Sequence, residues 1–160
     1  KYFHWDYGTA VPLQYLDPES KIPAVLTPTC YASSLDENIQ VGRQIDTTAK
    51  RLGKRVIVVV SNALTHLVVR GPATWPLPEH MEMDHKFIDM VKAADVDGAT
   101  EYLPGYARDA KCEMGGRGLG VFLGASKALE ENAGNLSGAQ YSPYAQSSAS
   151  GNANLALVAA

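Results

Sequence analysis

A histidine follows directly on the most β-branched stretch of the sequence. Residues 56–60 read Val-Ile-Val-Val-Val, and the next six, 61–66, read Ser-Asn-Ala-Leu-Thr-His. In open α/β sheets, ligands bind beyond the carboxyl ends of the strands. An imidazole at such a place acts as an acid or a base near neutral pH. His66 is therefore a candidate acid or base, and a histidine hydrogen-bonded within a loop is the alternative interpretation.

A carboxylate precedes a pair of glycines later in the chain. Glu113 is followed by Met114, Gly115 and Gly116, and an apolar helical pattern begins after them. Negative charge is favourable near a helix N-terminus. Glu113 is therefore predicted either to cap that helix or to ligate a metal, and composition alone favours the cap.

Three other motifs carry weaker signals. Residues 80–85 hold two histidines and two acids, but His80 and His85 are five positions apart, which favours solvated side chains over a metal cluster. The glycine-rich stretch 115–120 follows no predicted strand and matches no nucleotide-binding fingerprint. Tyr7 lies between Asp6 and Gly8 and could line a pocket, although ordinary turn chemistry explains the pattern as well.

The clearest element that could position these residues is a helix over 34–53. Ser34 and Glu37 have the spacing of a capping box. Apolar residues then recur at steps of three and four, which places them on one helical face. Gly53 follows the last turn and is a suitable C-cap.

Strands are predicted on either side of this helix, at 22–27 and 56–60. The second is an unbroken β-branched run, which is typical of a strand buried on both faces. Strand, helix and strand in this order predict a right-handed crossover between parallel strands. We therefore expect an α/β fold with a mixed central sheet flanked by helices.

The rest of the chain is predicted to be mainly helical. Apolar periodicity indicates helices near 83–91, 97–103 and 119–129. From 135 to 154 the chain is rich in Ser, Ala, Gly and Asn, which predicts a mobile segment, and 155–158 could form a last strand. The expected division is therefore a main unit, 1–134, and a C-terminal segment, 135–160.

Composition narrows the class of protein. A chain of 160 residues with 46% hydrophobic residues is one domain or part of one. A net charge of −3 argues against a nucleic-acid partner. No apolar run approaches the roughly 20 residues that span a bilayer, so no membrane is expected. Two cysteines are too few for a disulfide scaffold and fit a reducing, cytoplasmic location.

Taken in order, these motifs resemble the C-terminal half of the class III extradiol ring-cleaving dioxygenases, the LigB-type family. The resemblance covers roughly residues 5–130, and its strongest motif is the strand followed by Ser-Asn-x-Leu-Ser/Thr-His. The residues Ser-Gly-Asn-Ala at 150–153 are also similar to the Gly-Asn-Ala ending of the family. Within the family, the likeness is greatest to the catalytic β subunits that cleave 2-aminophenol.

This resemblance implies a non-haem iron(II) enzyme that opens the ring of a catechol or a 2-aminophenol with O₂. Its metal is held by two histidines and one carboxylate, which leaves positions open for substrate and O₂. Glu113 matches the carboxylate ligand, and His66 matches the acid/base histidine of the family. Tyr7 falls where many catechol-cleaving relatives carry a histidine, and a tyrosine at this position is similar to the aminophenol enzymes. Asn62 would flank the substrate pocket.

The sequence departs from the family pattern at the two iron-binding histidines. They belong to an N-terminal half that this sequence does not match, and its four histidines, at 4, 66, 80 and 85, stand in other contexts. We therefore expect 1–134 to be the C-terminal half of the family domain. The two histidines and further strands of the sheet would come from a missing N-terminal half or a second chain, in a homo- or hetero-oligomer.

Three hypotheses follow from these observations. The first is a catalytic part or subunit of an extradiol dioxygenase. The second is a non-catalytic structural subunit of the same family, and the third is a metal-free α/β module that binds a small molecule beyond residue 60. The presence of both Glu113 and His66 favours the first.

Overall fold

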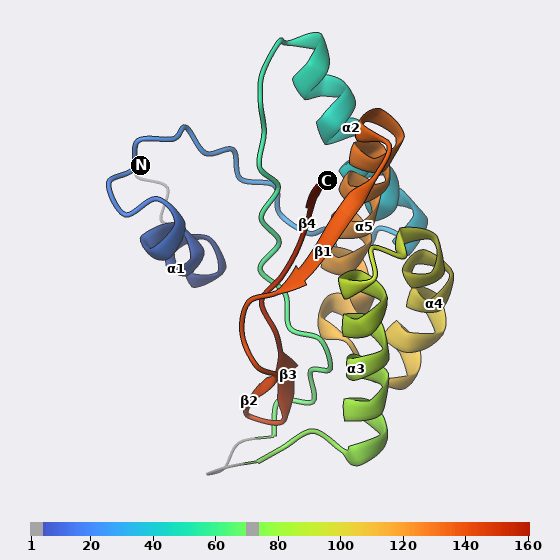
Figure 1. The fold of residues 1–160 in the computed structure, drawn as a ribbon. Helices are drawn as coiled ribbons and strands as arrows, with labels where there is room; N and C mark the ends of the chain where they lie inside the picture. Colours follow the sequence, from blue (N-terminus) through green and yellow to red (C-terminus); the bar gives the residue numbers. More distant parts are fainter. Residues whose placement is uncertain (1–4, 70–73) are drawn as a thin grey trace.

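The computed structural model describes residues 5–69 and 74–160 and has the predicted α/β class (Figure 1). None of the described helices is long and apolar enough to cross a bilayer. The helices are α1 (Tyr7–Leu16), α2 (Leu35–Arg51), α3 (Pro78–Lys92), α4 (Val96–Asp109), the short 3₁₀ helix η1 (Glu113–Gly116) and α5 (Arg117–Ala133). The strands are β1 (Leu136–Gln140), β2 (Ala145–Ser147), β3 (Ser150–Asn152) and β4 (Leu155–Ala159).

The capping box predicted for α2 is confirmed. The backbone N–H of Glu37 donates to Ser34 Oγ at 3.1 Å, and the N–H of Ser34 donates to the Glu37 carboxylate at 2.7 Å. Two N–H groups that the helix itself leaves without partners are thereby satisfied. These bonds also lower the pKa of Glu37.

Helices α2 and α5 are packed with their backbones in contact. A Cβ atom on Gly42 of α2 would lie 2.1 Å from the carbonyl oxygen of Val121. A Cβ atom on Gly124 of α5 would lie 2.0 Å from the carbonyl oxygen of Ile39. Only glycine allows such an approach, so these two positions set the distance between the helices.

The hydrophobic core lies between α3, α4 and α5. Both α3 and α4 are longer than the sequence periodicity predicts, and α4 continues through Pro104. Burial of one helical face outweighs the low intrinsic propensity of a proline in the middle of the helix. The largest fully buried core side chains are Tyr106, Phe87, Ile88, Leu103, Leu123, Val91 and Val96.

The strand predictions at 22–27 and 56–60 are wrong for this chain. Both stretches lie outside the assigned strands and run as coil, so the predicted parallel crossover is absent from the described residues (Figure 1). Val25 is 91% exposed and Ile57 is 81% exposed. A β-branched run becomes a strand only when a neighbouring strand pairs with it, and the described residues supply none.

The C-terminal segment is folded, so the prediction of a mobile segment is wrong. Strand β1 pairs antiparallel with β4, and β2 pairs antiparallel with β3, which makes one interrupted two-stranded ribbon. The ribbon turns at Ser148 and Ala149, which both have positive φ as in a type I′ turn. Its small residues allow close packing, since a Cβ on Gly138 would lie 1.9 Å from the carbonyl oxygen of Val91. The last strand, predicted at 155–158, is confirmed as β4.

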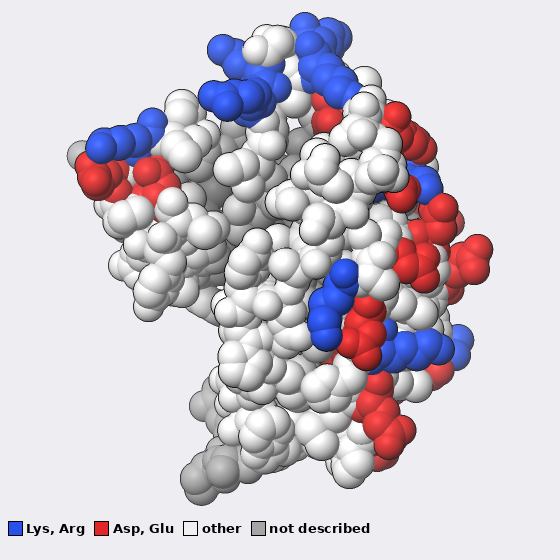
Figure 2. Space-filling model, in the orientation of Figure 1, with Lys and Arg blue, Asp and Glu red and all other residues white. Residues whose placement is uncertain are grey.

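The charged side chains are unevenly distributed on the face shown in Figure 2. Acidic and basic residues gather on the right, over the helices, and basic residues gather at the top, where α2 ends. The middle of this face, crossed by the chain that follows α2, carries few charges. The exposed β-branched run 56–60 therefore lies on a largely uncharged part of the surface.

Candidate functional site

The structure brings the His66 motif and the Glu113 motif side by side. The two short segments 64–66 and 111–113 run antiparallel, with a β-bridge between Thr65 and Cys112. The backbone N–H of Glu113 donates to the carbonyl oxygen of Leu64 at 3.1 Å, and the N–H of His66 donates to that of Lys111 at 3.0 Å. Two motifs 47 positions apart in sequence thus form one local structure.

The Glu113 carboxylate is held by the same segment. Its Oε2 accepts a short hydrogen bond from the N–H of Ala63. Within the described residues, Oε1 accepts none, so one oxygen stays open to a ligand. Helix α5 begins without a side-chain cap, so the capping interpretation of Glu113 is wrong.

A left-handed turn directs the chain from Glu113 into α5. Met114, Gly115 and Gly116 have φ values of 50°, 61° and 74°. Glycine adopts this conformation without cost, whereas a side chain such as that of Met114 is strained there. Strained backbone often accompanies a functional site because the surrounding structure must hold it in place.

Asn62 packs between this site and the start of α5. Its Nδ2 donates a short hydrogen bond to the carbonyl oxygen of Ala63. A Cβ atom on Gly118 would lie 2.3 Å from Asn62 Oδ1, so the amide rests directly on the α5 backbone. Asn62 therefore directly precedes the residue that binds the Glu113 carboxylate, and its place beside a substrate pocket stays a prediction.

His66 is half-buried and is bonded to a residue that sequence reasoning missed. Its Nδ1 lies 2.8 Å from Ser150 Oγ, and a β-bridge joins the two backbones. Ser150 belongs to β3, in the segment that composition predicted to be mobile. The similarity of 150–153 to the family ending was the one signal that pointed to this region.

Tyr7 is the first residue of α1, a helix that sequence reasoning did not predict. Asp6 caps the helix by accepting a hydrogen bond from the N–H of Thr9 at 2.9 Å. The Tyr7 side chain is 82% exposed. The helix nevertheless begins next to residues 61–66, called the site segment below, since a Cβ on Gly8 would lie 3.6 Å from Ser61 Oγ.

A buried carboxylate lies beneath this local structure. Asp84 of α3 is fully buried and accepts hydrogen bonds from the hydroxyls of Tyr106 and Tyr144, each at 2.6 Å, and from the N–H of Thr65 at 3.1 Å. Burial raises the pKa of Asp84, although these donors favour its charged form. Asp84 thus anchors the residue next to His66.

The expectation of solvated side chains over residues 80–85 is wrong in part. His80 is buried and its Nδ1 lies 3.3 Å from Thr65 Oγ1, so the solvated interpretation is wrong for it and for Asp84. His85 is exposed, and its ring lies 4.7 Å from that of Tyr144. His4 falls outside the described residues.

A comparison with known families identifies the chain. The model described as "Catalytic LigB subunit of aromatic ring-opening dioxygenase" matches residues 2–150. The chain belongs to the LigB family. Members of this family are dioxygenases that open aromatic rings, so the family assignment implies an oxidoreductase that uses O₂ and an aromatic substrate. The match extends past the main span of the resemblance, residues 5–130, and reaches the start of the similar ending at 150–153. No curated protein matches the chain.

The donor set fits part of the metal site of a LigB enzyme. Within the described residues no group of three or more potential metal-ligating side chains comes together. Glu113 lies on the segment that pairs with the backbone around His66, and a carboxylate is the anionic ligand of a two-histidine, one-carboxylate site. Among the described residues Glu113 is thus one candidate ligand, and a site of that kind would need two more.

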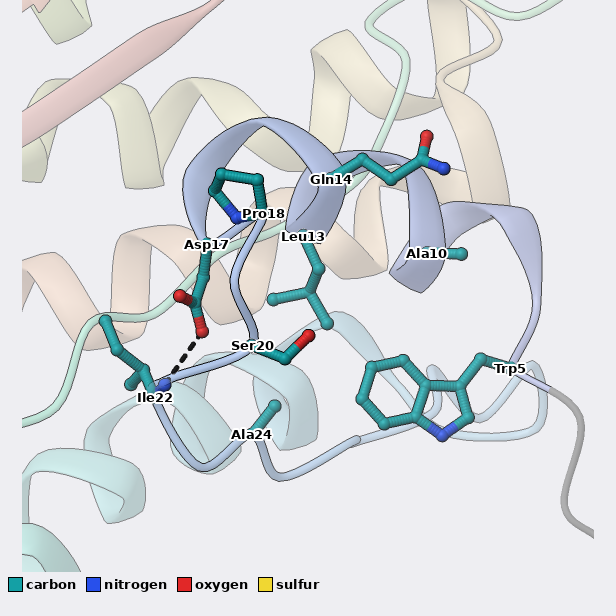
Figure 3. A pocket seen from close by; sticks show the side chains of 9 residues that line it. All are labelled: Trp5, Ala10, Leu13, Gln14, Asp17, Pro18, Ser20, Ile22 and Ala24. Carbon is teal, nitrogen blue, oxygen red and sulfur yellow. Dashed lines mark hydrogen bonds between the residues drawn. The ribbon is translucent and has the colours of Figure 1, made fainter.

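The apolar cavity of the LigB chain lies elsewhere. It measures about 220 Å³ and lies between α1 and the chain that follows it (Figure 3). Its one carboxylate, Asp17, is already engaged by the N–H groups of Lys21 and Ile22. None of the residues that line it is Tyr7, Asn62, His66 or Glu113, so this cavity is not the candidate site.

Proposed function

We propose that this LigB chain is the part of a non-haem iron(II) extradiol dioxygenase that carries the carboxylate ligand and the acid/base histidine. The substrate would be a catechol or a 2-aminophenol. The observation that supports this most is the antiparallel pairing of 64–66 with 111–113, which places His66 and Glu113 in one rigid backbone unit.

Glu113 would hold the metal through Oε1, while the N–H of Ala63 fixes Oε2. When bound, iron(II) would supply Lewis-acid and one-electron chemistry to the substrate and O₂. The hydrogen bond orients the carboxylate before the metal arrives, so little conformational entropy is lost on binding. An outer hydrogen bond of this kind is a usual feature of metal-ligating carboxylates.

His66 would hold and transfer a proton at Nε2, because its Nδ1 is engaged by Ser150. Within the described residues Nε2 makes no hydrogen bond, so it is available to a substrate. Asn62 would flank the substrate, and Tyr7 would approach it from the start of α1. A tyrosine at this position supports a 2-aminophenol substrate, by its likeness to the aminophenol enzymes.

The missing ligands would come from a further polypeptide segment. We propose that it packs on the exposed stretch 56–60 and supplies both a strand and the two histidines. Val56 and Val59 are each 51% exposed there. The middle of the face in Figure 2, which the chain after α2 crosses, carries few charged groups. Unpaired β-branched residues on an uncharged surface are suited to pairing with another strand.

Two free cysteines support a reducing compartment, the cytoplasm, for this activity. Cys30 is exposed and Cys112 is buried beneath the site. Burial raises the pKa of the Cys112 thiol to about 12, so it stays protonated at neutral pH.

The test measures iron content and ring cleavage on the protein as isolated with its partner segment. Glu113→Ala is expected to remove the iron, and His66→Phe to lower kcat by about 10²-fold while substrate binding is retained. His85→Phe is the control, since it changes an exposed histidine outside the site. Iron retained in Glu113→Ala would favour a structural subunit, and ligand binding unaffected by a chelator would favour a metal-free module.

A further inference from the structure

Within the described residues, Ser150 makes the one side-chain hydrogen bond to the His66 ring. Its Oγ lies 2.8 Å from His66 Nδ1, although the two residues are 84 positions apart in sequence. Ser150 is only 4% exposed. The Ser150 end of this hydrogen bond is therefore shielded from solvent.

The direction of this hydrogen bond follows from the needs of the hydroxyl. A buried hydroxyl without an acceptor is costly, so nearly all such groups find one. Within the described residues, His66 Nδ1 is the only acceptor recorded for Ser150 Oγ. A hydroxyl that donates to Nδ1 leaves the proton of the neutral ring on Nε2.

The backbone around Ser150 fixes this geometry. The N–H of Leu64 donates to the carbonyl oxygen of Gly151, and the N–H of Gly151 donates to that of Thr65, each at 2.9 Å. A Cβ on Gly151 would lie 2.1 Å from both Asp84 Oδ2 and the Tyr144 hydroxyl. The β3 strand is thus held by backbone hydrogen bonds to the site segment and by close packing against Asp84 and Tyr144.

We propose that Ser150 is a positioning residue that sets the tautomer of His66. It keeps Nδ1 occupied, so that Nε2 is the nitrogen that carries the transferable proton. The assignment of the tautomer rests on the structure alone, whereas its effect on turnover rests on the proposed ring cleavage. A hydroxyl suits this role because it can rotate and accept from Nδ1–H when the ring gains a second proton.

The test combines ring nitrogen NMR with steady-state kinetics. In the wild-type protein with its partner segment, ¹H–¹⁵N ring correlations should show the neutral His66 protonated on Nε2. In Ser150→Ala the ring should populate both tautomers, and kcat should fall by about tenfold or more at unchanged KM. Ser147→Ala, on the exposed side of the same turn, is the control and should behave as wild type.

Each result decides a separate point. A wild-type ring protonated on Nδ1 overturns the proposal, and this reading needs no variant to fold. Ser150→Ala with an unaltered tautomer and full kcat also overturns it. Absence of ring cleavage in the wild type contradicts the proposed function, while the NMR result still decides the role of Ser150.

Discussion

The hydroxyl of Tyr144 donates a 2.6 Å hydrogen bond to Oδ2 of Asp84, across 60 positions of sequence. Asp84 lies on α3, and Tyr144 precedes β2 in the C-terminal ribbon. Oδ1 of the same carboxylate accepts from the N–H of Thr65, next to His66. A single buried acid therefore connects a core helix, the site segment and the ribbon that carries Ser150.

Removing the Tyr144 hydroxyl should weaken this connection. Tyr144→Phe keeps the ring that lies against the His85 ring but leaves Asp84 Oδ2 without its donor. A hydrogen bond to a charged group contributes about 1.5–3 kcal/mol, and we expect the free energy of unfolding to fall by that amount. Urea denaturation measures it. Tyr141→Phe, at an exposed tyrosine, should change stability by less than about 0.5 kcal/mol; equal effects in both variants would contradict the role of the bond.

The raised pKa of Asp84 predicts a distinct pH dependence. Between the unfolded pKa of about 3.9 and the higher folded pKa, the folded protein binds more protons at Asp84 than the unfolded protein. The contribution of this group to stability is therefore greatest at acid pH and declines as pH rises through that window.

Comparison with Asp84→Asn isolates this contribution. The free energy of unfolding of Asp84→Asn minus that of wild type should rise from about pH 4 upward and level off above the folded pKa. Asp89→Asn is the control, because it removes a carboxylate on the exposed side of α3. A difference for Asp84→Asn that falls with rising pH would show that its pKa is lowered on folding.

The close contact between α2 and α5 predicts that one added methyl group will lower the stability of the protein. Gly42→Ala would place a Cβ within 2.1 Å of the Val121 carbonyl oxygen, so the helices must separate. Overpacking of this kind costs about 1–3 kcal/mol, measurable as a lower Tm. Gly105→Ala is the control, because no atom lies within 4 Å of its added Cβ, and alanine there should raise stability by about 0.5–1 kcal/mol. A similar Tm for both variants would contradict the close approach.

Local signals in the sequence predicted local structure well. The helix begun by Ser34 was predictable because its capping box and its apolar face lie within the helix itself. The coil at 56–60 was not predictable, because β-branched residues favour a strand locally, whereas a strand forms only if a distant part of the chain pairs with it. The candidate residues Glu113 and His66 were found from their motifs, but their pairing depends on contacts 47 positions apart.

The roles of Asp84 and Ser150 could not be predicted from the sequence for one shared physical reason. Asp84 is an acid in a polar stretch, and nothing near it in sequence reveals that two tyrosine hydroxyls will bury it. Ser150 lies among small polar residues whose composition resembles that of unfolded segments. Their roles come from partners that are remote in sequence, and a single chain does not display such pairs.

Main-chain groups place Glu113, since its own N–H binds the Leu64 carbonyl and its carboxylate binds the Ala63 N–H. Within the part of the chain that the structure describes, no side chain donates a hydrogen bond to its carboxylate. Substitutions around the site can therefore reshape what the enzyme accepts without displacing the acid. Under the proposed function, the arrangement would separate the choice of substrate from the retention of the metal ligand, and the scaffold would have room to diversify toward other aromatic compounds.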